Sequence, residues 1–591
     1  MKPRYPALRV VPVMRKIFVA AVPVALVAAA VASAATGSSR QSSQGSVVTS
    51  LLMPGVTYTR EVDFTSRGPI VLDVVTAPKP DGKVYSLAPA LSNNSLSDRE
   101  ALTQLDSRVA AGAASVAIDG DYFDNTTSAP TGILMQNGLL ESAPAVGRSS
   151  LGIAADGTLT TARVSSAGIW QGSGQRRPLL LNAPTGKFTL FTPAYGATTP
   201  KESGVFEAVL GSFPPARLGV PLDGTVAQVT AAGSTPIPSG GAVLVARGSQ
   251  STAQLRAEAP VGQQVEALLS LSPDWSSLAS AIGGGPLLVK NGKPIFQADE
   301  PFNSRQLNSR QARGAIGQLA NGSIVMVGVE GTKAAYSIGM SSYELAVELS
   351  QLGAVTAFGL GSGSAAGMAF NGALLTRPST GTTPKVSDAL VLSYTGIYAA
   401  QPSALVLSPN GDGVGDTEAL SYSVVRPSQV VATLAGPGGA HITLANAAEP
   451  PGVHTFAWNG SDSGSPAPEG KWTFTVTGTD DRNITTSATR TFSLDDTLSS
   501  LTVATGSHPT ASFDLTRAAK VLVQVERPNG VPVDTLRSGR QAAGSEHLTW
   551  HGLSGGLHAP SGRYQVAVQA TSSVGESSLV APFSYHAHKR K

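Results

Sequence analysis

The last third of the chain contains an internal repeat, and this repeat restricts the fold more than any other feature of the sequence. Two segments carry an aromatic pair at the same spacing of 14 residues, Trp458 with Trp472 and Trp550 with Tyr564. A repeated unit of about 90 residues with short strands and frequent turns is typical of an immunoglobulin-like sandwich. We therefore predict two all-β Ig-like sandwiches, in which these tryptophans are core residues rather than platforms for sugars. The predicted boundaries are 403–495 and 498–586.

The N-terminus has the pattern of a secretory signal. Five basic residues precede or begin an apolar run from Ile17 to Ala32, and Ala32-Ser33-Ala34 is a small-residue cleavage site. We expect a signal peptide at 1–34, a Ser/Gly/Gln-rich linker at 35–54, and a secreted, extracellular or envelope-associated protein. The apolar run is also long enough for an uncleaved membrane anchor, so the membrane would be a partner only through this segment.

Charge and cysteine content exclude several classes of function. The formal net charge is +3 over 591 residues, and it becomes −2 without the five positive charges of the signal. Such a chain lacks the basic face that nucleic acids require, so we predict no nucleic-acid partner. The absence of cysteine excludes disulfides, thiol nucleophiles and cysteine metal sites. Any catalysis must use carboxylates, arginine, histidine or hydroxyl groups.

The region 55–397 contains two similar units, each consisting of a helix, a glycine, a buried strand and a polar turn. In the second unit Ser341 and Glu344 have the spacing of a capping box, and Gly353 ends the helix. The first unit ends in the run 116–118 and an Asp-rich turn. This alternation predicts an α+β domain over 55–397.

Carboxylates follow the first of these strands. Asp119 and Asp121 lie in a turn of three carboxylates within six residues, in a chain with few charges. Such a cluster can bind a cation or act as acid and base. It can equally be a turn whose side chains bond to their own main chain.

Glycines and one arginine supply the other candidate groups. The amides of Gly283, Gly284 and Gly285 could face an anion. The turn that contains Ser362 and Ser364 could form the floor of a site, or only a tight connection. An arginine at a strand entrance, such as Arg313, suits phosphate or carboxylate, although a solvated surface arginine is the alternative.

Six segments in the same order resemble the phosphodiester glycosidase family, and the resemblance covers about 55–395. Among them are IDGDYFD at 118–124, GGGPLLVKNGKPI at 283–295 and RGAIGQLANGSIVMVGVEG at 313–331. The others lie at 132–138, 190–199 and 341–372. The resemblance implies hydrolysis of the bond between a sugar, similar to N-acetylglucosamine, and phosphate. The substrate would be a sugar phosphodiester or a cell-envelope glycan.

The resemblance also assigns roles. It implies that Arg313 is the phosphate ligand, that the three glycines with Ser362 and Ser364 contact substrate, and that the acids come from a set of three carboxylates. These candidate catalytic residues are Asp119, Asp121 and Glu330. The family has Asp where this chain has Gly361, and two serines where it has Ala365 and Ala366. Two hypotheses follow, namely a hydrolase with a changed site or a catalytically impaired glycan-binding or cell-surface protein.

The C-terminal repeats resemble FlgD-type Ig-like domains, which act as spacers or attachment modules in exported bacterial proteins. Near the start of the first repeat, Asn410, Asp412 and Asp416 offer oxygen ligands around glycines, as calcium loops do. A plain Asn-Gly/Asp-Gly turn is the alternative, since Val414 stands at one ligand position. Apart from this candidate calcium site, the sequence predicts no required cofactor.

Overall fold

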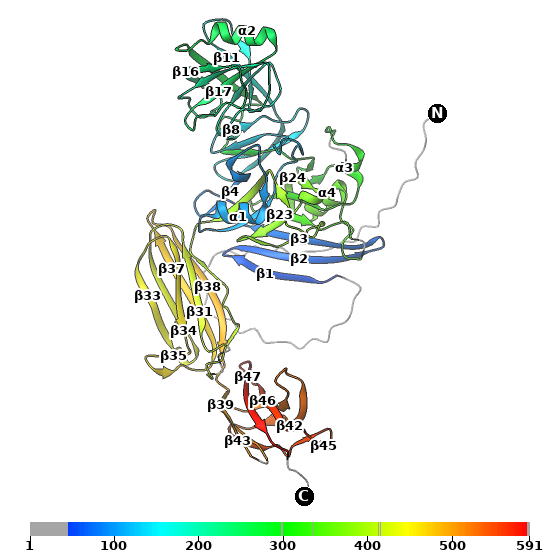
Figure 1. Ribbon diagram of the computed structural model, residues 1–591, viewed down its shortest axis with the longest axis vertical. Coiled ribbons are helices and arrows are strands. Elements are labelled where there is room, and N and C mark those ends of the chain that lie inside the picture. Colours follow the sequence, from blue (N-terminus) through cyan, green and yellow to red (C-terminus); the bar gives the residue numbers. More distant parts are fainter. Residues whose placement is uncertain are drawn as a thin grey trace, which may run out of the picture. The chain divides into compact units, whose positions relative to one another are not determined.

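The computed structural model describes residues 45–296, 299–333, 335–411, 413, 415–506 and 508–587. The predicted signal peptide at 1–34, the first half of the predicted linker (35–44 of 35–54), and Asp412 lie outside these residues. Strands form 52% of the structure and helices 8%, with four α-helices in the described part of the chain (Figure 1). None of these helices is both long and apolar enough to cross a bilayer.

The prediction of an α+β domain at 55–397 was wrong, because this region is nearly all β. The two expected helix–strand units exist, but between them the chain forms antiparallel hairpins at its many Gly and Pro turns. The prediction extended two local patterns over more than three hundred residues. The α-helices are α1 (Leu102–Ala110), α2 (Ser249–Glu258), α3 (Ser304–Asn308) and α4 (Ser342–Gln351).

An eight-stranded antiparallel sheet forms the base of this region. Its strands, in their order across the sheet, are β1 (Val47–Met53), β2 (Val56–Thr65), β3 (Gly68–Ala77), β23 (Ile324–Val329), β22 (Arg313–Leu319), β24 (Ala354–Ser362), β20 (Leu287–Lys290) and β21 (Lys293–Pro294). The central strands β22 and β23 are buried on both faces, as the continuous apolar run of β23 requires.

Two five-stranded sheets complete the core. The first contains β26 (Ala373–Leu374), β25 (Met368–Phe370), β6 (Ala114–Asp119), β28 (Asp388–Tyr394) and β4 (Tyr85–Leu91). The second contains β10 (Leu159–Arg163), β9 (Ser149–Ile153), β19 (Ser280–Ile282), β7 (Leu134–Gln136) and β8 (Leu139–Ser142). A short pair joins β5 (Glu100–Ala101) to β27 (Lys385–Val386).

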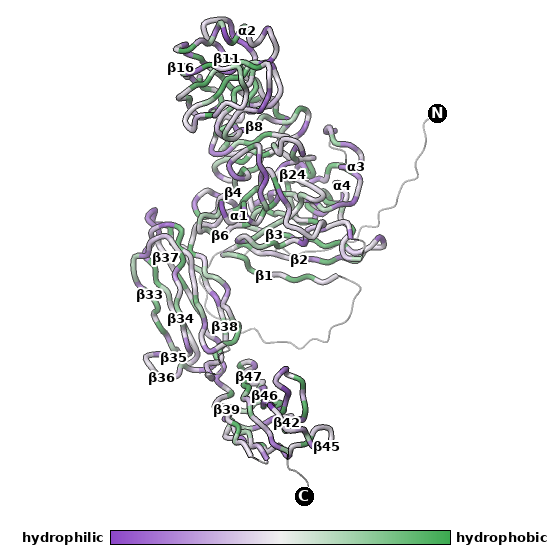
Figure 2. Tube along the Cα trace, viewed as in Figure 1, coloured by the Kyte–Doolittle hydropathy of each residue, from purple (hydrophilic) through white to green (hydrophobic). Residues whose placement is uncertain are grey.

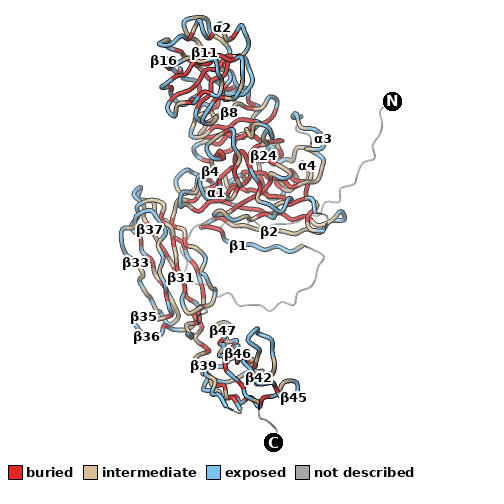
Figure 3. The backbone as a smooth tube through the Cα atoms, in the orientation of Figure 1, coloured by how far each residue is buried: buried red, intermediate tan, exposed pale blue. Residues whose placement is uncertain are grey.

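The first of these sheets packs face to face on the eight-stranded sheet, with an apolar core between them that includes Val116, Ile316 and Phe358. The helix α4 covers the other face of the large sheet through Leu345 and Leu349. The helix α1 covers the outer face of the small sheet. Figure 3 shows the resulting band of buried residues along these strands. The expected capping box of α4 is confirmed, since Ser341 and Glu344 exchange side-chain and main-chain hydrogen bonds.

The chain between β10 and β19 forms a further eight-stranded sheet with α2, which we call the inserted region (165–272). Its strands, in order, are β12 (Arg177–Pro178), β11 (Ser165–Gln171), β18 (Gln264–Ser272), β16 (Pro221–Thr230), β15 (Val205–Leu210), β17 (Ala242–Arg247), β14 (Phe188–Phe191) and β13 (Leu180–Leu181). Trp170, Phe188 and Leu244 lie in its apolar core.

Two β-sandwiches follow, as the repeat predicts. The first has β29 (Tyr398–Ala399), β31 (Glu418–Val424) and β34 (Gly452–Trp458) against β30 (Val406–Leu407), β38 (Thr485–Leu494), β37 (Gly470–Asp480), β32 (Ser428–Ala435) and β33 (His441–Glu449). The second has β39 (Leu498–Ala504), β40 (Thr510–Leu515) and β43 (Gly544–Thr549) against β42 (Pro532–Gln541), β41 (Ala519–Glu526), β46 (Gly562–Thr571) and β47 (Glu576–Tyr585). Short hairpins add β35 (Ser461–Asp462) with β36 (Ser465–Pro466), and β44 (Leu553–Ser554) with β45 (Leu557–His558).

The repeated aromatic pairs lie in the cores of these sandwiches. The ring centroids are 4.7 Å apart for Trp458 and Trp472, and 5.1 Å apart for Trp550 and Tyr564. Buried residues alternate with exposed or half-buried ones along strands such as β32 and β37, and Figure 2 shows hydrophobic and hydrophilic residues interspersed along the strands of this sandwich. The C-terminal Ig-like architecture is therefore confirmed, whereas the exact domain boundaries stay predictions.

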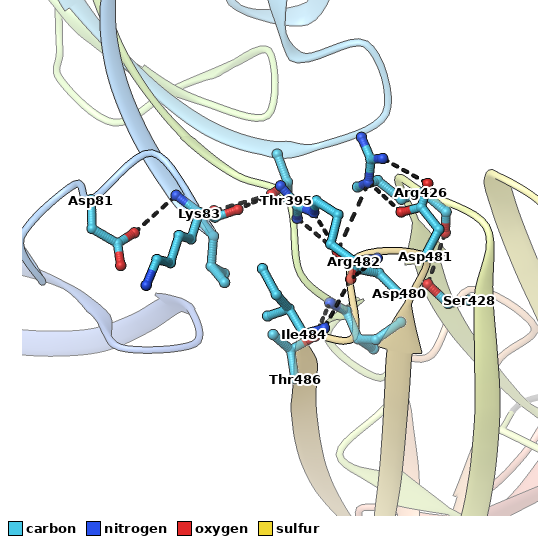
Figure 4. Close-up of polar contacts among 12 residues, drawn as sticks. Asp81, Lys83, Thr395, Arg426, Ser428, Asp480, Asp481, Arg482, Ile484 and Thr486 are labelled. Carbon is cyan, nitrogen blue, oxygen red and sulfur yellow. Dashed lines mark hydrogen bonds and ion pairs between the residues drawn. The ribbon is translucent and has the colours of Figure 1, made fainter. Parts of the chain in front are cut away.

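Figure 4 shows polar contacts at two groups of loops. Thr395 donates from Oγ1 to the main-chain oxygen of Lys83 at 3.4 Å. Arg426 makes two bonds to Asp481, at 2.6 and 2.7 Å, and Asp480 accepts from the amides that follow it in the β37–β38 turn. These contacts hold turns closed at the protein surface.

Candidate functional site

Segments distant in the sequence meet at the end of β6. The main-chain nitrogen of Gly361, in β24, donates to the oxygen of Gly120 at 2.7 Å, directly after β6. In the large sheet Arg313 stands opposite Ser362 of β24. The loop after β19 joins this group, since the nitrogen of Gly285 donates to the oxygen of Gly359 at 2.7 Å. The ends of β6, β19, β22 and β24 therefore frame one candidate site.

Asp119 is buried at the end of β6, and the glycines Gly314 and Gly361 lie close to its carboxylate. It has no exposed surface, and its Oδ1 accepts from the nitrogen of Gly367 at 2.9 Å, while its Oδ2 has no partner among the described residues. A Cβ atom on Gly361 would lie 2.6 Å from Oδ2, and one on Gly314 would lie 2.5 Å from Oδ1. Burial raises the pKa of Asp119 well above its usual range, although the Gly367 bond opposes this shift. Asp119 thus occupies the space that a side chain at position 361 would need.

Asp121 is neutralised by an arginine that the sequence analysis did not identify. The residue is 3% exposed, its side chain is fully buried, and its Oδ1 lies 2.5 Å from Nη2 of Arg148, while its Oδ2 accepts from the nitrogen of Gly132 at 2.5 Å. The Nε of Arg148 also donates to the oxygen of Gly284 at 2.9 Å. The guanidinium stacks between two aromatic rings, with 5.1 Å to the centroid of Tyr122. Arg148 immediately precedes the buried strand β9, and this position is the one sequence signal that could have found it.

Asp388 is a second residue that sequence reasoning missed. It is fully buried, and its Oδ1 accepts from the nitrogen of Asp121 at 2.8 Å. A Cβ atom on Gly120 would lie 2.4 Å from the same oxygen, so this turn requires glycine at position 120. Burial and the neighbouring Asp121 raise the pKa of Asp388 to about 8. Asp388 therefore fixes the turn that carries Asp121.

Arg313 is buried but has no acidic partner. It is 4% exposed, and its Nε donates to the oxygen of Met340 at 2.7 Å. Its Nη2 donates to the oxygens of Gln306 and Ser309 at 2.7 and 3.0 Å. Within the described ranges it takes part in no ion pair, and its Nη1 makes no hydrogen bond. Burial lowers the pKa of Arg313, and Tyr122 and the charge of Glu344 partly oppose this effect.

Two arginines that precede Arg313 in the sequence, Arg305 and Arg310, have different surroundings. Arg310 pairs with Glu344 and donates to the oxygen of Gly339 at 2.9 Å. Arg305 is exposed in α3. Of the three, Arg313 alone combines burial with the absence of a direct ion pair among the described residues.

Hydroxyl groups surround this guanidinium. Tyr122 is partly buried, and burial raises the pKa of its hydroxyl, whereas a hydrogen bond with Ser362 and the charges of Arg313 and Arg148 oppose the shift. The Nε2 of Gln311 donates to Oγ of Ser362 at 3.3 Å. This group of a cation, two hydroxyls and an amide can bind an anionic oxygen-rich ligand.

The predicted glycines and Ser364 have different surroundings. Gly283, Gly284 and Gly285 are buried, and the amides of Gly283 and Gly285 donate to main-chain oxygens of the protein. The oxygens of this loop face Arg148 and Tyr122 instead. Ser364 is exposed in the short turn after β24. Their predicted contacts with substrate stay predictions.

Glu330 belongs to another cluster. It is 2% exposed and pairs with Nη2 of Arg60 at 2.9 Å, and the nitrogen of Arg377 donates to it at 2.6 Å. Asp73 lies beside it, and burial together with Glu330 raises the pKa of Asp73 to about 8. No hydrogen bond or ion pair in the described structure joins Glu330 to Asp119. The three predicted catalytic carboxylates thus have three separate environments.

In the candidate calcium loop, the carboxylate of Asp416 is hydrogen-bonded to the main chain of the loop itself. The carboxylate of Asp416 accepts from the nitrogens of Gly411 and Gly413, both at 2.7 Å. Asn410 donates from Nδ2 to Ser408 and to the main-chain oxygen of Ser578. The described residues contain no group of three or more His, Cys, Asp or Glu side chains arranged for a metal. Calcium at this loop stays a prediction.

Comparisons with known proteins agree with both sequence resemblances. Residues 215–393 match the family model described as phosphodiester glycosidase, and residues 497–573 match that of the FlgD Ig-like domain. The predicted resemblance is therefore confirmed for these regions. No curated protein matches the chain significantly in sequence.

Several solved structures are similar. A hypothetical protein from Synechocystis is 26% identical with a TM-score of 0.50, and the match covers 59% of this chain and 64% of that one. The chain thus spans less than two thirds of this relative. A putative exported protein from Burkholderia pseudomallei is 22% identical, with a TM-score of 0.45 and coverage of 55% and 74%. The zebrafish N-acetylglucosamine-1-phosphodiester alpha-N-acetylglucosaminidase catalytic domain, auto-inhibited by its pro-peptide, is 13% identical, with a TM-score of 0.32 and coverage of 59% and 88%.

Proposed function

We propose that the region 55–397 hydrolyses glycosyl phosphodiesters. The reaction would cleave the bond between the anomeric carbon of an N-acetylglucosamine-like sugar and phosphate, in envelope or extracellular glycans. The family match at 215–393 supports this class of reaction. The environment of Arg313 is the observation that carries the proposal.

A buried charge is costly unless a partner of opposite charge or several hydrogen bonds compensate it. Three main-chain oxygens orient the guanidinium of Arg313, but none of them carries a full negative charge. A phosphodiester would supply the missing anion and could accept from the unbonded Nη1. The hydroxyls of Tyr122 and Ser362 would contact other oxygens of the substrate.

The leaving group explains how a site with few accessible acids could work. Breaking the bond between the anomeric carbon and oxygen leaves electrons on phosphate, and a guanidinium stabilises this growing charge. Less protonation of the leaving group is then required than for an ordinary glycoside. The attacking water still needs a base. We assign this role to Asp121, which is next to Tyr122 in the chain and is held in place by Arg148.

Binding without turnover is the second candidate function, and one observation favours it. The three candidate carboxylates are all enclosed, with exposed fractions of 0% for Asp119, 3% for Asp121 and 2% for Glu330. A general base must reach the water from which it takes a proton. In this case Arg313 would hold an anionic glycan without cleaving it.

Hydrolysis of an α-N-acetylglucosaminyl phosphodiester by the full chain tests both candidates. We expect Arg313→Gln to lower kcat/KM by on the order of a hundredfold or more, because it removes charge stabilisation in the transition state. Asp121→Asn should lower kcat, whereas the exposed Arg305→Gln should match the native protein. Arg313→Lys, which keeps the charge, should be less impaired than Arg313→Gln, and melting curves check that each variant folds.

The outcomes separate the two candidates. If the native chain binds the phosphodiester without turnover and Arg313→Gln loses this binding, the protein is the non-catalytic binder. If the native chain neither binds nor hydrolyses this phosphodiester, both candidates are wrong. Turnover that survives Arg313→Gln unchanged would contradict the role of this arginine.

A further inference from the structure

The inserted region contains a cavity of its own. It has a volume of about 390 Å³ and lies between the strands β12, β13 and β14 and the first turns of α2. This volume falls within the usual range for small-molecule sites, roughly 300 to 1,000 Å³. None of its lining residues belongs to the site around Arg313, so the two sites are separate.

The charges around the cavity are positive. Arg176, Arg177 and Lys187 line it, and none of the described lining residues is acidic. Arg177 is balanced by Glu258, with 2.7 Å between Nε and Oε2. Arg176 is exposed and donates only to the neutral Oε1 of a glutamine, at 3.3 Å, while the exposed Lys187 makes no side-chain bond to any described residue. Two positive charges therefore remain available to a ligand.

Unused hydrogen-bonding groups face the same space. Ser251 of α2 lines the cavity, and its hydroxyl makes no hydrogen bond to any described residue, so it is free to pair with a ligand. Gln250 and Gln254 add two amides that likewise make no side-chain hydrogen bond with described residues. In addition, α2 begins at Gly248 without a side-chain cap, so its first turn adds positive potential.

One wall of the cavity is apolar. Leu180 is 43% exposed at its edge, and Phe188 lies behind it, with its ring centroid 5.2 Å from that of Trp170. A sugar ring has both an apolar face of CH groups and a rim of hydroxyls, and the cavity offers a surface for each. The two free cations add a preference for a negative charge on that sugar.

We propose that this cavity binds one acidic sugar unit, a hexose that carries a phosphate or a carboxylate group. The proposal does not depend on the hydrolytic function. It gives the inserted region a binding role that is separate from the site of Arg313.

Calorimetric titration of the full chain tests the proposal, with glucose 6-phosphate and glucuronate as the two acidic probes and glucose and inorganic phosphate as references. The double variant Arg176→Gln/Lys187→Gln removes both free charges at exposed positions, so the fold should be unchanged. We expect it to weaken binding of the acidic sugar by about tenfold or more. Ser251→Ala should weaken it less.

One control variant isolates the cavity. Lys201→Gln removes an exposed charge elsewhere in the inserted region and should bind glucuronate like the native chain. Binding of glucose 6-phosphate alone, or of both probes, identifies which acidic group the cavity accepts. No binding of either acidic sugar, or binding that the double variant retains, would overturn the proposal. Equal affinity for inorganic phosphate or for neutral glucose would also overturn it, since the first needs no sugar and the second needs no charge.

Discussion

Arg148 and Arg313 are two buried arginines in similar positions with different electrostatic surroundings. Each precedes or begins a buried strand, and their exposed fractions are 9% and 4%. Arg148 contacts the carboxylate of Asp121, whereas Arg313 contacts only main-chain oxygens. The first charge is balanced within the protein. The charge of Arg313 is held in place by main-chain oxygens but has no direct ion pair, so the anion of a ligand can pair with it.

The largest expected effect concerns the balanced arginine. Arg148→Met leaves Asp121 buried without its partner, and we expect the free energy of unfolding to fall by about 3 to 5 kcal/mol. Chemical denaturation of the full chain, followed by a probe in the N-terminal region, measures this loss. Asp121→Asn added to Arg148→Met should recover part of the stability, because no unpaired charge then remains. A loss in Arg148→Met no larger than in Arg305→Met would show that the pair is not structural.

The next largest effect is expected at Gly361, because its missing side chain leaves the space that the carboxylate of Asp119 occupies. Gly361→Asp places a side chain where Asp119 already lies, and we expect a loss of about 1 to 3 kcal/mol from overpacking. Replacing Asp119 by Gly in the same chain makes room, so the double variant should be more stable than Gly361→Asp alone. Thermal unfolding of both single variants and the double variant gives the coupling energy. Additive effects would mean that the two positions do not share this space.

The Asp73 and Glu330 pair predicts a pH dependence. The pKa of Asp73 is about 8 in the folded chain, against 3.8 for an ordinary carboxyl, so between these values the folded state binds more protons than the unfolded state. Stability should therefore fall as pH rises from about 4 to about 8, by at most about 1.4 kcal/mol per pH unit from this group. Asp73→Asn should flatten the profile, as measured by denaturation at several pH values. An unchanged slope in Asp73→Asn would contradict the assignment.

The smallest effect is expected at the surface. Arg426 and Asp481 form a well-aligned pair in Figure 4, but both side chains are largely solvated, with exposed fractions of 39% and 44%. Solvent and salt screen such pairs. Arg426→Gln should leave the melting temperature of the first sandwich unchanged within error. A clear decrease in the melting temperature would mean that burial does not explain why the Arg148–Asp121 pair contributes more to stability than the Arg426–Asp481 pair.

Local features of the fold could be predicted from the sequence, whereas long-range pairing could not. The capping box of Ser341 and Glu344 depends on residues three apart, and the structure contains it. The aromatic pairs recur at a fixed spacing and predict a core contact in each repeat, and the Ig-like sandwiches contain these contacts. The α+β class failed because helix–strand units were visible locally, while the antiparallel pairing that joins β3 to β23 spans some 250 residues of sequence.

The candidate site shows the same division. Arg313 stood out because it opens a buried strand within a recognisable motif, although its role stays a prediction. Arg148 and Asp388 were missed because their partner Asp121 lies 27 and 267 residues away, and only the fold brings these charges together. The contact of Gly361 with Asp119 was invisible for the same reason.

The central claim is that Arg313 carries an unbalanced charge that binds the phosphate of a sugar phosphodiester. Titration of N-acetylglucosamine 1-phosphate into the native chain, Arg313→Gln and Arg305→Gln, repeated at two salt concentrations, tests it most directly. We predict that Arg313→Gln weakens the affinity by at least about tenfold, while Arg305→Gln binds like the native chain. Equal affinity of the native chain and Arg313→Gln would contradict the claim.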